Sequence, residues 1–399
     1  MLSNIKKRFP IYNKNPDLIF FDTAASALKV DSMINSITDC YSYEYANIHR
    51  GIYKLSSELT KRYEKTRQLV SEFINAPSAN NIIFTKSATE SINLVSSCLS
   101  DIYFEDGDEV LVSTLEHHAN LVPWHLVSKK IKIISANLKT NGELDYNDLI
   151  EKINSKTKLV ALTHMSNVTG SITNFEDIKK KTNQLNIPIL IDGCQYVPHK
   201  KLDIKELDPD FYVFSAHKLY GPSGLGLLYM KDKWINRFRP YQGGGSMIKN
   251  VETDSSSYLD GFHKFEAGTP PIAQVIGLSS SINFINEIGI DNIYSYENHL
   301  SKYAYEKLKS YKDIIIYGDF NNQTSIVSFN LKGIHFNDLA IILDKKNIAI
   351  RTGHHCAQPF MKYFNISGNA RISIGVYNTL EDIDYLIKSL DEVKKILND

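Results

Sequence analysis

The first residue whose setting suggests chemistry is Lys218, which directly follows Ser215-Ala216-His217. The apolar run 211–214 before it has the length of a buried strand, and the glycine-rich segment 221–226 after it breaks regular structure. The ammonium group therefore lies just past a strand end, where it requires water or a specific partner. A lysine in this position suits Schiff-base formation with an aldehyde cofactor, whereas the plainer interpretation is a surface lysine in a polar turn.

Asp192 is the second such residue, because it ends the apolar run Ile189–Ile191. A buried carboxylate is costly unless it meets a cation, and the protonated ring nitrogen of pyridoxal phosphate would be one. For a lone Asp after a strand, a helix N-cap is the alternative. Asp192 and Lys218 at the ends of two successive strands together favour the cofactor.

Further polar residues follow strands and could hold the rest of that cofactor. Thr89 opens a helix directly after a strand, where free amide groups and the helix dipole attract a phosphate. Ser215 and His217 could donate to the same phosphate, and His117 could lay its imidazole on the ring. A capping role for Thr89 and a structural role for His117 remain the alternatives.

Composition limits the classes of function. The chain has 399 residues, and its 45 Lys+Arg balance 45 Asp+Glu, so no net field favours nucleic acid or an anionic membrane. No apolar stretch has the length of a membrane span and no signal peptide is present, so we expect a cytoplasmic protein without contact to a membrane. The cysteines lack metal-ligand spacing, which predicts free thiols and no metal site. They are Cys40, Cys98, Cys194 and Cys356.

Alternating strands and helices must position these residues. Strands are expected at 18–21, 81–84, 109–112, 131–135, 159–162, 187–191, 211–214 and 227–230, and helices at 30–43, 55–74, 88–99, 175–185, 272–288 and 294–308. This alternation predicts an α/β fold with a mostly parallel sheet that is covered on both faces. Ligands of such sheets bind outside the carboxyl ends of the strands, where the polar residues named above are found.

The last third of the chain has a different pattern. Strands are expected at 314–317, 325–331, 348–351 and 370–374, with helices at 337–343 and 380–397. These elements predict a smaller α+β domain at the C-terminus. The preceding segment, Tyr241–Asp260, is rich in Gly and Ser and is expected to be a loop of functional length.

The segment Arg351–Pro359, with the sequence RTGHHCAQP, carries a resemblance that extends over almost the whole chain. It resembles the corresponding segment of group II (SufS-like) cysteine desulfurases, which are fold-type I pyridoxal phosphate enzymes related to selenocysteine lyase. The other matching motifs are DTAAS at 22, NIHRG at 47, EHHANLVPW at 116, THMSNVTG at 163, DGCQ at 192, FSAHKLYGPSGLG at 214, GGGSMI at 243 and FEAGTP at 265. Together these motifs are highly specific, although no one of them would be.

The resemblance implies an architecture. An N-terminal segment (1–15) would pack with the small domain, a large domain (16–280) would carry a seven-stranded sheet and the cofactor, and a small C-terminal domain (281–399) would carry the cysteine loop. The resemblance also implies a homodimer.

The resemblance further implies a role for each matching residue. Lys218 would be the Schiff-base lysine and Cys356 the nucleophile that takes the sulfur. The remaining cofactor contacts would be Asp192 at the pyridine nitrogen, Gln195 at the ring hydroxyl, His117 stacked on the ring, and Thr89, Ser215 and His217 at the phosphate, with Thr269 reaching the site of the partner subunit. The substrate carboxylate would be bound by Arg371 and Asn167, with His49 and Arg351 lining the pocket. We expect Arg351, His354 and His355 to favour the thiolate of Cys356.

The implied reaction converts L-cysteine to L-alanine and leaves a persulfide on Cys356. An acceptor of the SufE or SufU type would then take the sulfur for iron–sulfur cluster assembly. A selenocysteine lyase on the same scaffold is the alternative, because both substrates share one amino-acid backbone. An aminotransferase or kynureninase-like enzyme would not need Cys356. The chain departs from the family pattern at Ala88, where a hydroxyl residue often stands, and Gln358 and Phe360 leave the identity of the acceptor open.

Overall fold

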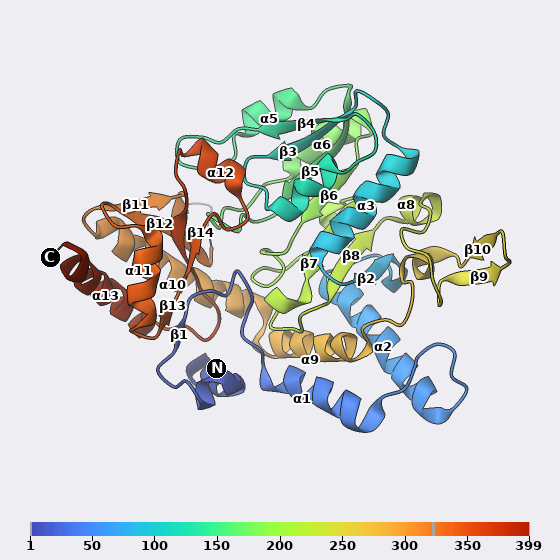
Figure 1. The fold of residues 1–399 in the computed structure, drawn as a ribbon, viewed down its shortest axis with the longest axis horizontal. Helices are drawn as coiled ribbons and strands as arrows, with labels where there is room; N and C mark the ends of the chain where they lie inside the picture. The colour runs from blue at the N-terminus through green and yellow to red at the C-terminus, as the bar shows by residue number, and fades with distance from the viewer. Residues whose placement is uncertain (1, 321–323, 399) are drawn as a thin grey trace.

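A seven-stranded sheet forms the centre of the larger part of the molecule (Figure 1). This computed structural model describes residues 2–320 and 324–398. The strand order is β2-β8-β7-β6-β5-β3-β4. The strands are β2 (Ile82–Thr85), β3 (Glu109–Ser113), β4 (Lys132–Ala136), β5 (Thr157–Thr163), β6 (Ile189–Asp192), β7 (Phe211–Ser215) and β8 (Gly226–Met230). Because β8 alone runs antiparallel to its neighbours, the mostly parallel seven-stranded sheet is confirmed.

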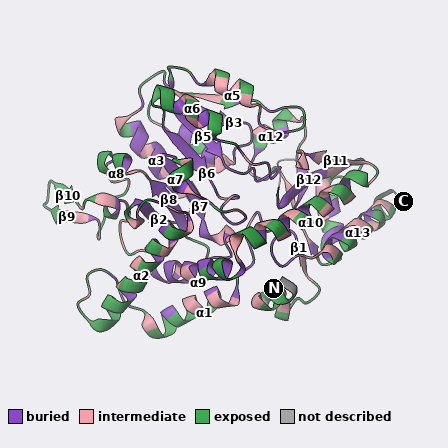
Figure 2. Cartoon of the chain, turned by 180° about the vertical axis from the view of Figure 1, so that it is seen from behind, coloured by how far each residue is buried: buried purple, intermediate pink, exposed green. Residues whose placement is uncertain are grey.

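Helices cover both faces of this sheet, since successive strand residues point to opposite sides. In β7, Phe211 and Val213 belong to the core that contains α3 (Ala88–Ile102) and α8 (Asp232–Arg237). Tyr212 and Phe214 belong to the core that contains α2 (Lys54–Phe73) and α9 (Ile272–Ile288). The buried residues therefore concentrate on the strands between the helices, as Figure 2 shows in purple. The helices of this part are α1 (Asp31–Asp39), α2 (Lys54–Phe73), α3 (Ala88–Ile102), α4 (Val122–His125), α5 (Tyr146–Lys152), α6 (Glu176–Leu185), α7 (Ile204–Leu207), α8 (Asp232–Arg237) and α9 (Ile272–Ile288).

The C-terminal part has its own antiparallel sheet, in the order β11-β12-β15-β14. Its strands are β11 (Ile314–Tyr317), β12 (Ile326–Leu331), β14 (Arg351–Gly353) and β15 (Asn369–Ser373). A third apolar core joins this sheet to α10 (Ile290–Ser310), α11 (Phe336–Asp344) and α13 (Leu380–Asn398). The expected α+β unit is present.

Three local expectations need correction. The expected strand 348–351 divides into β13 (Ile348–Ala349), which pairs with β1 (Ile19–Phe20), and β14, which pairs with β15. A short helix, α12 (Gln358–Tyr363), follows Cys356 where none was expected; its proline lies in the first turn, where a missing N–H costs nothing. The expected loop 241–260 contains a hairpin of β9 (Ile248–Val251) and β10 (Ser256–Tyr258), which projects from the body in Figure 1. The apolar alternation that marks a strand is missing there, because this hairpin is largely exposed.

The N-terminal segment touches both parts of the molecule. Phe9 is fully buried against Tyr220, Phe284 and Tyr377, while Lys6 pairs with Asp382 at the start of α13. The predicted domain boundary between residues 280 and 281 falls inside α9, so the division of the chain into these domains stays a prediction. No helix in the part of the chain that the structure describes is long and apolar enough to cross a membrane.

Candidate active site

A cavity of ≈ 220 Å³ lies at the carboxyl ends of β5, β6 and β7, where ligands of such sheets are expected. Most of the predicted site residues line it, and they come from both parts of the molecule. These residues are Thr89, His117, Asn167, Asp192, Gln195, Ser215, His217, Lys218, Arg351 and Arg371.

Asp192 and Lys218 line the same cavity because they lie at the carboxyl ends of β6 and β7, which are neighbouring parallel strands. Asp192 is the last residue of β6, and its Oδ1 accepts a hydrogen bond from the N–H of Cys194 at 3.0 Å. Lys218 ends a single helical turn directly after β7. Between Asp192 and Cys194, a Cβ on Gly193 would stand 2.1 Å from the hydroxyl of Tyr212, so only glycine lets this turn pack so closely. An acidic and a basic side chain, Asp192 and Lys218, therefore line the same small cavity.

The start of α3 forms another wall of the cavity. Ser87 is the N-cap, because its side chain accepts from the N–H of Glu90, which leaves Thr89 exposed beside the cavity. Ser215 accepts a hydrogen bond from the N–H of Ala88 at 2.9 Å and so ties β7 to the helix start. A Cβ on Gly226 would lie 2.2 Å from the backbone of Ser87, so the helix start rests directly on β8. Its positive end, with hydroxyl groups around it, suits a phosphate.

His117 is uncharged in the folded protein. Burial, together with nearby positive groups of which Lys218 is the strongest, lowers its pKa to about 3. Its Nδ1 accepts a hydrogen bond from the N–H of Ala119 at 3.0 Å, so the single ring proton is assigned to Nε2. A neutral, oriented ring of this kind suits stacking on a planar group.

Glu116 fixes the segment that carries His117, although the sequence did not identify Glu116 as a site residue. It is fully buried and accepts hydrogen bonds from Ser113 Oγ, Asn120 Nδ2 and the N–H of Thr163. Burial raises its pKa to about 7, although these hydrogen bonds oppose the rise. A glutamate so deeply buried could not have been recognised locally, because both of its neighbours in sequence, Leu115 and His117, are compatible with a surface loop.

Arg371 is buried at the opposite side of the cavity with one part of its guanidinium group unused. Its Nη1 donates to the carbonyl of Asn167 at 2.9 Å and its Nη2 pairs with Asp22 at 3.0 Å, whereas its Nε has no hydrogen-bond partner within residues 2–320 and 324–398. Burial lowers the pKa of Arg371 to about 10, and Asp22 opposes this fall. The sequence showed Asp22 only as the first residue of the DTAAS motif and did not identify it as the partner of Arg371.

Cys356 lies on a loop at the rim of the cavity. Its Sγ is 3.9 Å from Nη2 of Arg351, which does line the cavity. Two successive non-glycine residues, His355 and Cys356, have left-handed backbone with φ of 51° and 56°. Such strained backbone persists only when its surroundings hold it, and the N–H of His118 donates to the carbonyl of Cys356 at 2.7 Å.

The expectation that both loop histidines favour the thiolate needs correction. The ring of His355 is buried and hydrogen-bonded to Asn369, and burial lowers its pKa to about 3, so it brings no positive charge to Cys356. His354 accepts the N–H of Cys356 at its Nδ1 and so holds the backbone. Arg351 is the charged neighbour that contacts the sulfur.

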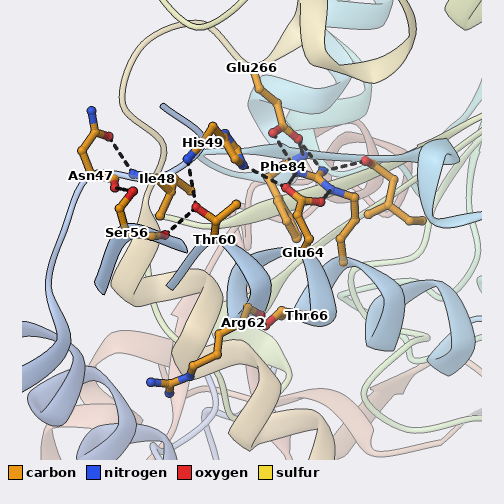
Figure 3. A network of polar contacts seen from close by, with 12 residues as sticks. Asn47, Ile48, His49, Ser56, Thr60, Arg62, Glu64, Thr66, Phe84 and Glu266 are labelled. Atoms are coloured by element: carbon orange, nitrogen blue, oxygen red, sulfur yellow. Dashed lines mark hydrogen bonds and ion pairs between the residues drawn. The ribbon is translucent and has the colours of Figure 1, made fainter. Parts of the chain in front are cut away.

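Two predicted residues lie outside the cavity of their own chain. His49 is bonded through Nε2 to Glu64 at 3.1 Å, in the network that Figure 3 shows around Thr60, Glu64 and Glu266, so its predicted place in a substrate pocket stays a prediction. Thr269 lies in a separate hollow beside Glu266, and its predicted contact with the partner's site stays a prediction. No group of three or more His, Cys, Asp or Glu residues that could hold a metal ion is found in the described part of the chain.

Several known cysteine desulfurases match this chain over nearly its full length. The family model for class-V aminotransferases matches residues 19–386. A cysteine desulfurase from Wigglesworthia glossinidia brevipalpis is 43% identical over 403 residues, which cover 99% of this chain and 98% of that protein. The crystal structure of the cysteine desulfurase CsdA from Escherichia coli superposes with a TM-score of 0.93 at 33% identity and covers 100% of this chain and 99% of its own. The apo structure of a cysteine desulfurase from Thermococcus onnurineus NA1 gives a TM-score of 0.94 at 35% identity, with 99% and 98% covered.

Proposed function

Because the chain belongs to the class-V aminotransferase family, we propose that it acts as a pyridoxal phosphate-dependent cysteine desulfurase. It removes the sulfur of L-cysteine, releases L-alanine and carries the sulfur as a persulfide on Cys356. The observation that carries this proposal is the place of Cys356, whose sulfur contacts Arg351 at the rim of the cavity that contains Lys218 and Asp192. An enzyme that only exchanged amino groups would need no thiol there.

The residues that line the cavity fit pyridoxal phosphate in their donor set. Asp192 would hold the ring nitrogen, His117 would lie on the ring, and the start of α3 with Thr89 and Ser215 would hold the phosphate. The close approach of Ser87 to Gly226, which no larger residue permits, shapes the phosphate end. When bound, this cofactor supplies a carbonyl that condenses with the substrate amine and a ring that takes up electrons from Cα.

The residues of this chain would then handle the substrate carboxylate, a proton and the sulfur. Arg371, with its Nε unpartnered, would bind the carboxylate, and Lys218 would move the proton at Cα. The Cys356 thiolate would attack the substrate sulfur, so that an S–S bond forms as the Cβ–S bond breaks. The electron pair of the broken bond stays with the carbon skeleton, which takes up a proton and leaves as L-alanine.

The proposal extends to partners and location. The sulfur would pass to an acceptor of the SufE or SufU type for iron–sulfur cluster assembly in the cytoplasm. The enzyme would act as a homodimer, in which Thr269 reaches the partner's cavity. Support for the dimer comes from a cluster of exposed apolar side chains beside the 47–51 loop, among them Tyr43 at 79% and Ile52 at 103% exposure.

Turnover of L-cysteine by the enzyme loaded with pyridoxal phosphate tests this proposal. The wild type should form alanine and a persulfide on Cys356, which mass spectrometry detects. Cys356→Ala should carry no persulfide, whereas Cys98→Ala, which removes a buried thiol that does not line the cavity, should still form it. Lys218→Ala should lose both products, and an unchanged rate in this variant would refute the mechanism.

A further inference from the structure

The turn that carries Lys218 is bonded to a buried glutamate of the C-terminal part, Glu297 on α10. Tyr220 follows Lys218 by two positions, and its hydroxyl donates to Oε1 of Glu297 at 3.2 Å. Both side chains are fully buried, and the proposed reaction uses neither of them. This bond joins the end of β7 to a helix that packs on the other sheet.

Tyr220 has left-handed backbone, with φ of 56°. A bulky residue keeps this conformation only where its surroundings hold it. The ring of Tyr220 packs against Phe9, Phe284 and Tyr377, and its hydroxyl also accepts the N–H of Val376 at 3.3 Å. The hydrogen bonds of the hydroxyl therefore help to hold a strained backbone close to Lys218.

The strained residue and Lys218 belong to one tight turn. The N–H groups of Leu219 and Gly221 both donate to the carbonyl of Ala216, at 2.9 and 3.1 Å. A Cβ on Gly221 would stand 2.7 Å from that carbonyl oxygen, so the turn is closely packed and has little room to absorb a shift. A change in the backbone of Tyr220 is therefore expected to move Lys218.

Glu297 is held from both parts of the molecule. In the larger part, Nδ1 of His199 lies 2.5 Å from its Oε2, and in the C-terminal part the hydroxyl of Ser325 donates to the same oxygen at 3.3 Å. Ser325 directly precedes β12, and its carbonyl accepts a backbone N–H directly after β15 at 2.7 Å. β15 carries Arg371, which we propose binds the substrate carboxylate. Glu297 thus connects the lysine turn to the sheet that holds Arg371.

We propose that Glu297 is a positioning residue, which holds Lys218 in register with Arg371 through Tyr220. The inference deepens the proposed desulfurase function and rests on it, because Lys218 would move the proton at Cα while Arg371 holds the carboxylate on the same carbon. Proton transfer requires close approach of the two atoms, so a displaced lysine slows this step. Binding of the carboxylate does not depend on the lysine. Loss of the link should therefore lower kcat and leave KM nearly unchanged.

Variants that break the link from either end test this proposal. Tyr220→Phe removes only the hydroxyl and keeps the ring, whereas Glu297→Leu removes the acceptor. Tyr303→Phe is the matched control on the same helix, because its hydroxyl donates to Asp384 of α13 at 2.6 Å and neither residue lines the cavity. Three quantities are measured on each enzyme loaded with pyridoxal phosphate. They are hydrogen exchange at 219 and 221, the pH midpoint of the visible absorbance band of the bound cofactor, and kcat and KM for L-cysteine.

We expect both link variants to exchange faster at 219 and 221 and to shift the pH midpoint of the band by about 0.5 unit, because the protonation of a lysine nitrogen responds to its surroundings. Their kcat should fall about tenfold, with KM within about twofold of the wild type. The double variant should lose no more kcat than either single variant, since all three lack the same link. Tyr303→Phe should match the wild type in every quantity.

The proposal is overturned if Tyr220→Phe unfolds at a lower urea concentration but keeps the wild-type band midpoint and kcat, since Glu297 would then be structural only. Equal changes in Tyr303→Phe, or an additive loss in the double variant, would also overturn it. Should Glu297→Leu not fold, the comparison of Tyr220→Phe with Tyr303→Phe decides, because each loses a single hydroxyl. If the wild type forms no alanine from L-cysteine, the desulfurase function itself fails, whereas hydrogen exchange and the band midpoint still test the link to Lys218.

Discussion

Replacing Arg67 should destabilise the protein far more than replacing another arginine on the same helix. Arg67 is 1% exposed and stands between Glu64 and Glu266: its Nε binds Glu64 at 2.8 Å, and its Nη1 and Nη2 bind Glu266 at 2.6 and 2.9 Å. Its guanidinium group also lies over Phe84 and Phe262, at 4.4 and 4.1 Å from the ring centroids. Figure 3 shows Glu64, Phe84 and Glu266, which belong to this network.

The expected loss of stability follows from the buried carboxylate that Arg67→Ala would leave without its cation. Arg67→Ala leaves Glu266, whose side chain is 10% exposed, with the N–H of Phe84 as a hydrogen-bond donor but without its cation. Removal of one partner of a buried pair costs about 3–5 kcal/mol. The control is Arg62→Ala on the same helix, where a 43% exposed side chain pairs with Glu44, and we expect it to cost less than about 1 kcal/mol.

The assay is urea unfolding followed by circular dichroism, with hydrogen exchange at 261–270 as a second measurement. Arg67→Ala should lower the free energy of unfolding and raise exchange in that loop, whereas Arg62→Ala should do neither. The double variant Arg67→Met, Glu266→Leu should recover much of the loss, because no charge is then left buried. A loss for Arg67→Ala within about 1 kcal/mol of that for Arg62→Ala would refute the reasoning.

Three further predictions concern the cavity. The pKa of the Glu116 carboxyl is raised from its ordinary value of 4.5 to about 7. The stability that this shift contributes is complete below pH 4.5 and is lost as the pH rises through about 7. The melting temperature of the wild type, relative to that of Glu116→Gln, should therefore fall between pH 4.5 and 7. If the two curves stay parallel over this range, Glu116 is not the titrating group. His117, with its pKa lowered to about 3, should show no imidazole titration by NMR between pH 5 and 8, and a midpoint near 6.5 would contradict its assigned neutral state. Gly226→Ala should push the start of α3 away from β8 and weaken pyridoxal phosphate binding at least tenfold, whereas Gly245→Ala, where a Cβ meets open space, should bind it as the wild type does.

The sequence alone was sufficient to predict the features that depend on residues close together in the chain. Apolar runs such as 189–191 and 211–214 identify buried strands because a strand covered on both faces must be apolar at nearly every position. Asp192 and Lys218 follow those runs directly, so their common location at one sheet edge followed from the parallel arrangement. The RTGHHCAQP segment likewise carried enough residues in series to indicate a family, which the full-length relatives bear out.

Tertiary structure decided whatever depends on residues far apart in the chain. Asp22 and Arg371 are separated by 349 positions, and no local pattern could have paired them. His355 looked like a charged neighbour of Cys356, but its burial against Asn369 makes it neutral, since desolvation disfavours the charged imidazole. His49 binds Glu64 on α2 and does not line the cavity of its own chain, which the sequence could not indicate. The residue types determine which chemistry is available, and long-range packing determines which of these residues meet and which of them carry a charge.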